Sequence, residues 1–418
     1  MKRTLASLVL GLSLLMGAAT SAWAQDFDKG VRAYKRGDYA TALKEWRPLA
    51  EQGDMRAQHI LGFMYENGLG VARSWQHYKD ALKWYRLSAE QGFAISQYNL
   101  GLMYEGGKGV AQDYKEAAKW FQLAAEQGDA KAQNNLGFMF TTGKGVAQDY
   151  KEAAKWFRLA AEQGYDNAQN SLGVMYENGW GVAQDYKEAV KWFRLAAKQR
   201  YDKAQNNLGK MYGNGWGVAQ DYNEAVKWYL LAAEQGDAQA QFNLGVLYGN
   251  GWGVAQDYKE AAKWYRLAAG QGIANAQYNL GMMYAKGKGV VKDYKEAVKW
   301  HRKSAEQGLA EAQYYLGFMF SVGQGVVKDY KEAVNWYRSA AEQRVVDAQY
   351  NLGVMYAKGE GVIQDDVLAH MWLSIGASNG DAGSAKVRDM VAKLMTAADI
   401  SKAQQLAREC VARNYKGC

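Results

Sequence analysis

The sequence predicts an all-α solenoid, a stack of antiparallel helix pairs, and three observations support this prediction. A tryptophan recurs every 36 residues from Trp84 to Trp372, and an aspartate recurs at the same spacing from Asp113 to Asp365. The 418 residues include 46 Gly but a single Pro, which indicates many turns between uninterrupted helices. A fixed period of about 20–50 residues is typical of proteins whose repeated units stack on one another.

The first half of each unit predicts a helix, as residues 130–140 illustrate. Apolar side chains fall on one face at helical spacing, at Ala132, Leu136, Met139 and Phe140. A glycine follows this leucine in nine units, although glycine inside a helix costs about 1 kcal/mol relative to alanine. Its recurrence therefore predicts a close helix–helix contact in every unit.

The second half of the unit predicts another helix, over residues 149–164. Asp149 is a good N-cap residue, and Glu152 three positions later gives a start that resembles a capping box. Gly164 supplies the left-handed residue that ends many helices. Neither helix can bury its apolar face alone, so neighbouring pairs must stack, with the recurring tryptophans between them.

The first 24 residues are typical of a secretory signal peptide. Lys2 and Arg3 precede an apolar stretch over residues 5–19, and small residues precede a cleavage position after Ala24. The alternative is an uncleaved anchor. No later stretch is long and apolar enough to predict a transmembrane helix. We therefore expect a periplasmic or secreted protein.

The repeated motif reads A-x-A-Q-x-x-L-G-x-M-[YF], then G-x-G-V, D-Y-x-E-A-x-x-W and A-A-x-Q-G. It resembles the Sel1-like repeat (SLR), a relative of the tetratricopeptide repeat (TPR), in about nine units over residues 54–380. Residues 25–53 resemble a degenerate TPR-like hairpin, and residues 381–418 are expected to form capping helices. The resemblance implies a right-handed superhelix that binds proteins or peptides.

In arrays of the tetratricopeptide type, the first helix of each pair lines the concave surface. In one unit this implies exposed inner positions at Lys131, Asn134, Asn135, Phe138, Thr141 and Thr142. Across the units, the candidate partner-binding residues are Asn99, Asn135, Asn207, Asn243, Asn279, Asn351, Lys210, Phe242, Tyr278, Tyr314, Tyr315 and Tyr350. Amides donate and accept hydrogen bonds, so this row suits the backbone of an extended peptide. The alternative is that the asparagines bond to neighbouring helices or water.

Three consecutive turns carry a tryptophan between two glycines. These residues are Trp180, Trp216 and Trp252. If exposed, they form a possible platform that stacks on sugars or clasps a partner loop. The alternative is that each ring packs over its own turn and on the next hairpin.

Residues typical of catalysis or metal binding do not cluster in the sequence. The four histidines are scattered, and His301 stands where most units have Phe or Tyr, which favours a packing role. No catalytic or phosphate-binding motif and no basic run is present, so we expect no enzyme, no cofactor, no metal and no nucleic-acid partner. Cys410 and Cys418 are a possible disulfide in an oxidising compartment; intermolecular pairing and free thiols are the alternatives.

The function these features favour is that of an exported protein–protein interaction scaffold or regulator. Its partner, a protein or peptide, is expected on the concave face. The alternative is binding of cell-envelope carbohydrate, peptidoglycan or polysaccharide, through the tryptophan turns and the tyrosines of the groove.

Overall fold

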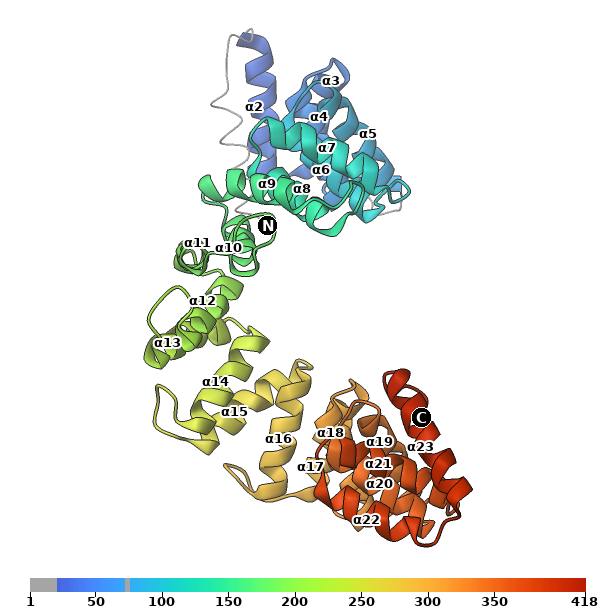
Figure 1. Cartoon of the computed structure of the whole chain (residues 1–418). Coiled ribbons are helices and arrows are strands. Elements are labelled where there is room, and N and C mark those ends of the chain that lie inside the picture. Colours follow the sequence, from blue (N-terminus) through green and yellow to red (C-terminus); the bar gives the residue numbers. More distant parts are fainter. Residues whose placement is uncertain (1–20, 72–75) are drawn as a thin grey trace. The chain divides into compact units, whose positions relative to one another are not determined.

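The computed structural model describes residues 21–71 and 76–418, and within these ranges every regular element is a helix (Figure 1). The predicted all-α solenoid of helix pairs is therefore confirmed. Most of the predicted signal peptide lies outside the described residues. The described chain divides into two compact units: the first extends to Met211 and includes Gly215–Ala219, and the second comprises Tyr212–Asn214 and Gln220–Cys418.

Each repeat contributes a first helix and a second helix. The N-terminal pair is α2 (Ser21–Lys35) and α3 (Tyr39–Glu51). The first helices that follow are α4 (Met55–Asn67), α6 (Ala94–Gly106), α8 (Ala130–Thr142), α10 (Asp166–Asn178), α12 (Asp202–Asn214), α14 (Ala238–Asn250), α16 (Ala274–Lys286), α18 (Ala310–Val322) and α20 (Val346–Lys358). Their second helices are α5 (Gln76–Glu90), α7 (Tyr114–Glu126), α9 (Tyr150–Glu162), α11 (Tyr186–Lys198), α13 (Tyr222–Glu234), α15 (Tyr258–Gly270), α17 (Tyr294–Glu306), α19 (Tyr330–Ala341) and α21 (Asp366–Ser378). The last pair is α22 (Ala382–Ala392) and α23 (Ala397–Ala412).

At the start of the second helix, the predicted aspartate N-cap forms, but the predicted capping box does not. Asp149 caps α9, and its carboxylate accepts a hydrogen bond from the backbone N–H of Glu152 at 3.1 Å. The reciprocal half of a capping box is missing, because the N–H of Asp149 donates to the carbonyl of Phe140 at 2.9 Å. The Glu152 carboxylate instead pairs with Lys155 at 3.3 Å. Each aspartate therefore joins its helix to the preceding one.

The glycine after the recurring leucine makes the predicted close contact. A Cβ atom on Gly137 would lie 2.7 Å from the Phe157 ring, and one on Gly245 would lie 2.5 Å from the Tyr265 ring. The same approach recurs between Gly62 and Tyr85, Gly101 and Phe121, Gly173 and Phe193, Gly281 and His301, and Gly317 and Tyr337. Because the second helix places a ring directly against this backbone, no larger residue fits.

Arginine replaces the glycine that ends the second helix in two units. Arg200 has φ 66° and Arg344 has φ 69°, so both take the left-handed conformation that Gly164 adopts with φ 86°. The turns at these two positions therefore form as in the other units. A residue with a Cβ atom holds this conformation less favourably than glycine does.

A buried glutamine connects neighbouring helix pairs at several places within each compact unit. The Gln133 side-chain amide donates to the carbonyl of Ala125 at 3.0 Å, and its oxygen accepts from Gln163 at 2.8 Å. The same bond between glutamines recurs from Gln127 to Gln97, Gln199 to Gln169, Gln271 to Gln241, Gln307 to Gln277 and Gln343 to Gln313. This satisfies the polar groups at the ends of the second helices without water.

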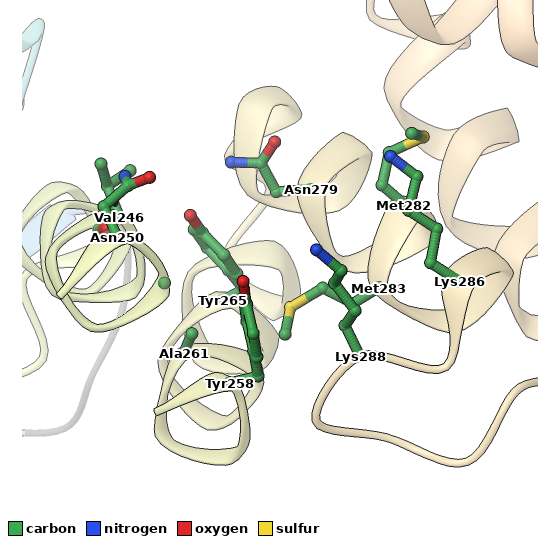
Figure 2. A pocket seen from close by; sticks show the side chains of 11 residues that line it. Val246, Asn250, Tyr258, Ala261, Tyr265, Asn279, Met282, Met283, Lys286 and Lys288 are labelled. Atoms are coloured by element: carbon green, nitrogen blue, oxygen red, sulfur yellow. Dashed lines mark hydrogen bonds between the residues drawn. The ribbon is translucent and has the colours of Figure 1, made fainter. Parts of the chain in front are cut away.

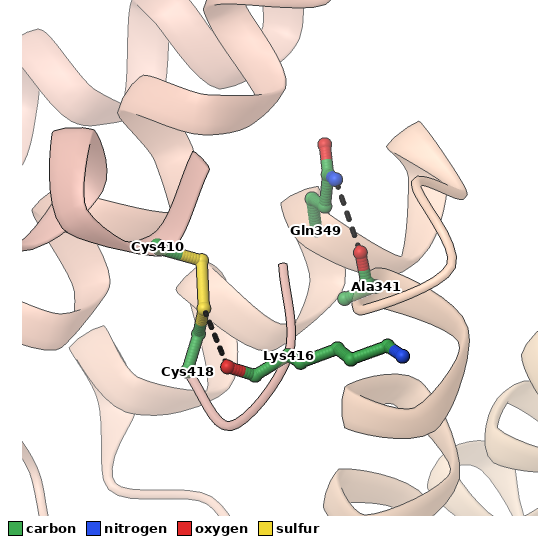
Figure 3. The surroundings of a disulfide bond; sticks show 5 residues. All are labelled: Ala341, Gln349, Cys410, Lys416 and Cys418. Atoms are coloured by element: carbon green, nitrogen blue, oxygen red, sulfur yellow. Dashed lines mark hydrogen bonds between the residues drawn. A yellow bond between two sulfur atoms is a disulfide. The ribbon is translucent and has the colours of Figure 1, made fainter. Parts of the chain in front are cut away.

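The last residues are fastened to the end of the array by a disulfide. Cys410 and Cys418 are bridged, with their Cα atoms 5.6 Å apart (Figure 3). Cys410 and Tyr415 are buried and belong to the same apolar cluster as Trp372 of α21. The bridge closes the final turn and thereby keeps Tyr415 in that cluster.

Candidate functional site

The predicted asparagine row lies on one side of the first helices, which we call the ladder face. All six asparagines of the row are half-buried. Asn207 of α12 donates to Asn170 of α10 at 2.9 Å, and Asn135 of α8 hydrogen-bonds with the hydroxyl of Tyr98 in α6. Contacts between neighbouring helices, the alternative to peptide binding, therefore use part of the capacity of these amides.

Three tyrosines of the ladder face form a cluster, and two of them, Tyr278 and Tyr315, contact a buried histidine. The ring centroids of Tyr278 and Tyr315 are 5.8 Å apart, and those of Tyr314 and Tyr315 are 5.3 Å apart. Beneath them, His301 stacks on Tyr315 at 5.7 Å and is fully buried, in line with the predicted packing role. Burial raises the pKa of Tyr278 to about 12, so its hydroxyl stays neutral and donates.

Other candidates on this face contact a second helix, which belongs to the same pair for Phe242 and to the preceding pair for Asn279 and Asn99. The Phe242 ring lies 5.9 Å from that of Tyr265. Burial raises the pKa of Tyr265 to about 12, and a hydrogen bond with the Asn279 side chain opposes this rise. Asn99 bonds in the same way with Tyr85. The remaining candidates, which are also half-buried, are Asn243, Asn351 and Tyr350.

One expectation for this face needs correction, and one candidate has a partner within the protein. Asn134 is buried and not exposed, because its position lies between adjacent first helices, where the equivalent Asn170 bonds with Asn207. Lys210 is held by an ion pair with the buried Glu177 at 2.5 Å, so its charge is already neutralised within the protein. Phe138, by contrast, is exposed as expected.

The three tryptophan turns match neither predicted situation completely, because each ring packs on the preceding pair and not on the next hairpin. Each indole stacks on the tyrosine that begins the second helix of the preceding pair, with centroids 5.8 Å apart for Trp180 and Tyr150, 5.5 Å for Trp216 and Tyr186, and 5.4 Å for Trp252 and Tyr222. The rings nevertheless stay 43%, 37% and 45% exposed, respectively. One side of each ring is therefore packed, while a large part of the ring remains accessible.

A pocket of about 420 Å³ among α14, α15 and α16 was not predicted (Figure 2). Its polar lining includes Tyr258, Tyr265, Asn279, Lys286 and Lys288. The signal in the sequence is a missing side chain: Gly249 stands where several other units have glutamate. Reactive or ligand-binding side chains do not reveal such a site in the sequence, because the pocket forms where a side chain is missing.

A row of exposed aliphatic residues was also missed. Val291, Val327 and Ile363 are almost fully exposed in the turns that precede three successive second helices. The earlier units have alanine at this position, for example Ala147. This change from alanine to larger β-branched residues was visible in the sequence.

The described residues contain no group of three or more His, Cys, Asp or Glu side chains placed to hold a metal ion. Among these residues, no helix has the length and apolar character needed to cross a membrane. The groups that the described surface presents are hydroxyls, amides, aromatic rings and ammonium groups. They bind ligands through hydrogen bonds, stacking and charge.

Stacked helix pairs with glycine turns, joined by buried glutamines, define a repeat protein of the tetratricopeptide class. The Sel1 repeat model matches nine consecutive segments, residues 56–93, 94–129, 130–165, 166–201, 202–237, 238–273, 274–309, 310–345 and 346–381. The chain belongs to the Sel1 repeat family, whose members generally mediate protein–protein interactions.

Two solved structures resemble the chain along most of its length. One is a protective antigen present in uropathogenic Escherichia coli strains, which displays an SLR fold; it is 34% identical with a TM-score of 0.60, over 94% of this chain and 93% of that one. The other is a Sel1 repeat protein from Oxalobacter formigenes, 36% identical with a TM-score of 0.60, over 75% of this chain and 89% of that one. A search of curated proteins gave no match.

Proposed function

We propose that the chain is an exported scaffold that binds a protein or peptide partner on the ladder face. The observation that carries the proposal is the cluster of Tyr278, Tyr314 and Tyr315, which gathers half-buried rings and hydroxyls on adjacent first helices. Tyrosine is enriched at protein interfaces because its ring supplies apolar area and its hydroxyl a hydrogen bond.

The variation between units supports the same face. Phe138 is exposed on α8, and its equivalents in the other units include Lys210, Met282 and Phe318. The neighbouring packing positions keep the same leucine and glycine in every unit. A face that changes on a constant frame can present a different chemical group to each segment of an extended partner.

The predicted signal peptide and the disulfide favour export. A bridge between Cys410 and Cys418 forms and persists in an oxidising compartment, whereas the cytosol keeps thiols reduced. Sequencing of the mature N-terminus from the native host should give Gln25. A start at Met1 would contradict the cleavage.

Site-specific photo-cross-linking tests the binding face. A benzoylphenylalanine at position 138 or 318, where the chain has exposed phenylalanines, should cross-link to the same partner in the native host. Positions 195 and 267 are matched controls, because Leu195 and Leu267 are exposed on second helices. Adducts from the two controls, with none from the ladder face, would overturn the proposal.

The exposed indoles favour carbohydrate binding as a second candidate. In this case the mature protein should be retained on peptidoglycan or envelope polysaccharide. Trp216→Lys should abolish the retention without loss of fold, because Lys144 and Lys288 occupy the same turn position and lie over Tyr114 and Tyr258. Equal retention of the variant would exclude the tryptophan turns as the binding element.

A further inference from the structure

The pocket among α14, α15 and α16 stands where the first unit holds a carboxylate. In α4, Glu66 accepts a hydrogen bond from the hydroxyl of Tyr85 at 3.0 Å. The same carboxylate pairs with Lys108, which lies between two glycines in the turn after α6, at 3.5 Å. One internal carboxylate is thus bound by a tyrosine hydroxyl and by a lysine of the next pair.

The next unit has a glutamate and a lysine at the same two positions, and the lysine acts on the glutamate through its charge. Burial raises the pKa of Glu105, and the positive charge of Lys144, the lysine of the following glycine turn, lowers it. Its second helix has Phe121 in place of the tyrosine, so the lysine acts there without a hydroxyl. Two units thus have a lysine turn and an internal glutamate that faces it.

The third lysine turn lacks this glutamate. Lys288 lies between two glycines and over the Tyr258 ring at 4.9 Å, as Lys144 does over Tyr114 at 5.4 Å. The position equivalent to Glu66 is Gly249, and a Cβ atom placed there would meet no described atom closer than 3.8 Å. The missing side chain therefore leaves the pocket open.

The groups that bind a carboxylate remain in place. Tyr265 is the equivalent of Tyr85, and its raised pKa of about 12 keeps the hydroxyl protonated as a donor. Lys286 and Lys288 line the same pocket, and neither forms an ion pair with a described carboxylate. Figure 2 shows the side chains of Asn279, Met283 and Lys288 next to the rings of Tyr258 and Tyr265.

We propose that this pocket binds a carboxylate group of a ligand in the position that Glu66 occupies in the first unit. Its volume of about 420 Å³ leaves room for the adjoining part of the ligand, since small-molecule pockets measure about 300–1,000 Å³. The site itself is independent of the proposed scaffold function. That function determines the source of the carboxylate: an acidic side chain of a bound peptide, as opposed to a free small dicarboxylate.

Methyl NMR of the full mature chain, with ¹³C-methyl methionine, tests the proposal. Met282 and Met283 line the pocket and report on occupancy even when binding is weak. The probes are a capped pentapeptide with one central glutamate, its glutamine counterpart and free glutarate. We expect saturable shifts of these two methyl signals with the glutamate peptide and none with the glutamine peptide.

Two substitutions at the same repeat position separate the pocket from the fold. Gly249→Glu restores the internal carboxylate and should weaken binding at least tenfold, while Gly213→Glu in α12, which is not part of the pocket lining, should leave binding unchanged. Lys288→Gln should weaken binding and reduce its dependence on salt concentration.

Equal shifts with both peptides, or unchanged binding by Gly249→Glu, would overturn the carboxylate site. Shifts with glutarate and none with the glutamate peptide would support the site and assign it to a small acid. Failure of the site would leave the cross-linking from positions 138 and 318 unaffected. The scaffold function and the pocket can therefore fail separately.

Discussion

The surroundings of Tyr85 in the first compact unit and of Tyr265 in the second compact unit differ at the position next to the tyrosine hydroxyl, which is Glu66 in one and Gly249 in the other. Both rings lie against the glycine of the first helix, at Gly62 and Gly245. Tyr85 donates to an internal carboxylate, whereas Tyr265 faces a pocket. The comparison shows that the packing of a ring against the glycine backbone fixes how the two helices of a unit pack. Whether a cavity or an ion pair forms beside that ring depends on a single residue of the unit.

The largest expected effect comes from breaking the packing that both regions share. Gly245→Leu forces a side chain into the Tyr265 ring and should destabilise this part of the array by about 3 kcal/mol. Gly249→Ala, four residues later on the same helix, is the control: its Cβ atom would meet nothing closer than 3.8 Å, so it should be neutral or stabilising. Chemical denaturation compares the two, and equal stability would contradict the close-contact explanation.

An intermediate effect should follow when the closed region is opened. Glu66→Gly removes the acceptor of the buried Tyr85 hydroxyl and adds a helical glycine, at a combined cost of about 2–3 kcal/mol. Glu105→Gly adds the same glycine beside Phe121, which has no hydroxyl, and should cost about 1 kcal/mol. Denaturation curves for the two variants should differ accordingly; equal losses would show that the hydroxyl bond contributes nothing.

The smallest effect concerns two buried histidines, one in each region. His59 has a partner, since its Nδ1 lies 2.9 Å from the hydroxyl oxygen of Ser96, whereas neither ring nitrogen of His301 has a described partner. His301→Phe should therefore stabilise the protein by about 1 kcal/mol at neutral pH. His59→Phe, the matched control, should not stabilise it.

The same substitution changes the pH dependence of stability. Burial lowers the pKa of His301 to about 4, below its unfolded value of about 6.5, so the unfolded state takes up the proton first. The titration of this histidine therefore leaves the free energy of unfolding unaffected above about pH 6.5 and decreases it as the pH falls towards 4. His301→Phe should flatten this part of the stability curve, and an unchanged slope would contradict the assignment.

The helices and their packing could be predicted because the residues that specify them recur in many units of the sequence. The recurring leucine and glycine predicted the contact at Gly137, and the recurring aspartate predicted the cap at Asp149. Repetition tests such a prediction within one sequence, because a residue type that recurs at the same position of every unit has the same structural role in each. The signal peptide and the partner have no such repetition to support them. The asparagines of the ladder face do recur, but their recurrence does not distinguish contacts between helices from contacts with a partner.

The pocket and the state of the ladder face could not be predicted for a physical reason. The pocket depends on the absence of a side chain at Gly249, and absence has no pattern of its own. Whether Asn207 is free or bonded depends on where Asn170 lies, a distance between helices that period and propensity do not specify. The ion pair between Lys210 and Glu177 likewise depends on the distance between two helices.

The glutamine bonds between pairs have a consequence for how such a chain changes over generations. Each donor and acceptor, such as Gln163 and Gln133, finds its partner in the adjacent pair and needs no feature special to its place in the array. Removal or duplication of one 36-residue segment therefore brings together ends that already match. Unequal recombination between the similar DNA segments that encode the units would change the length of the protein in whole steps, and each product would still close every one of these bonds.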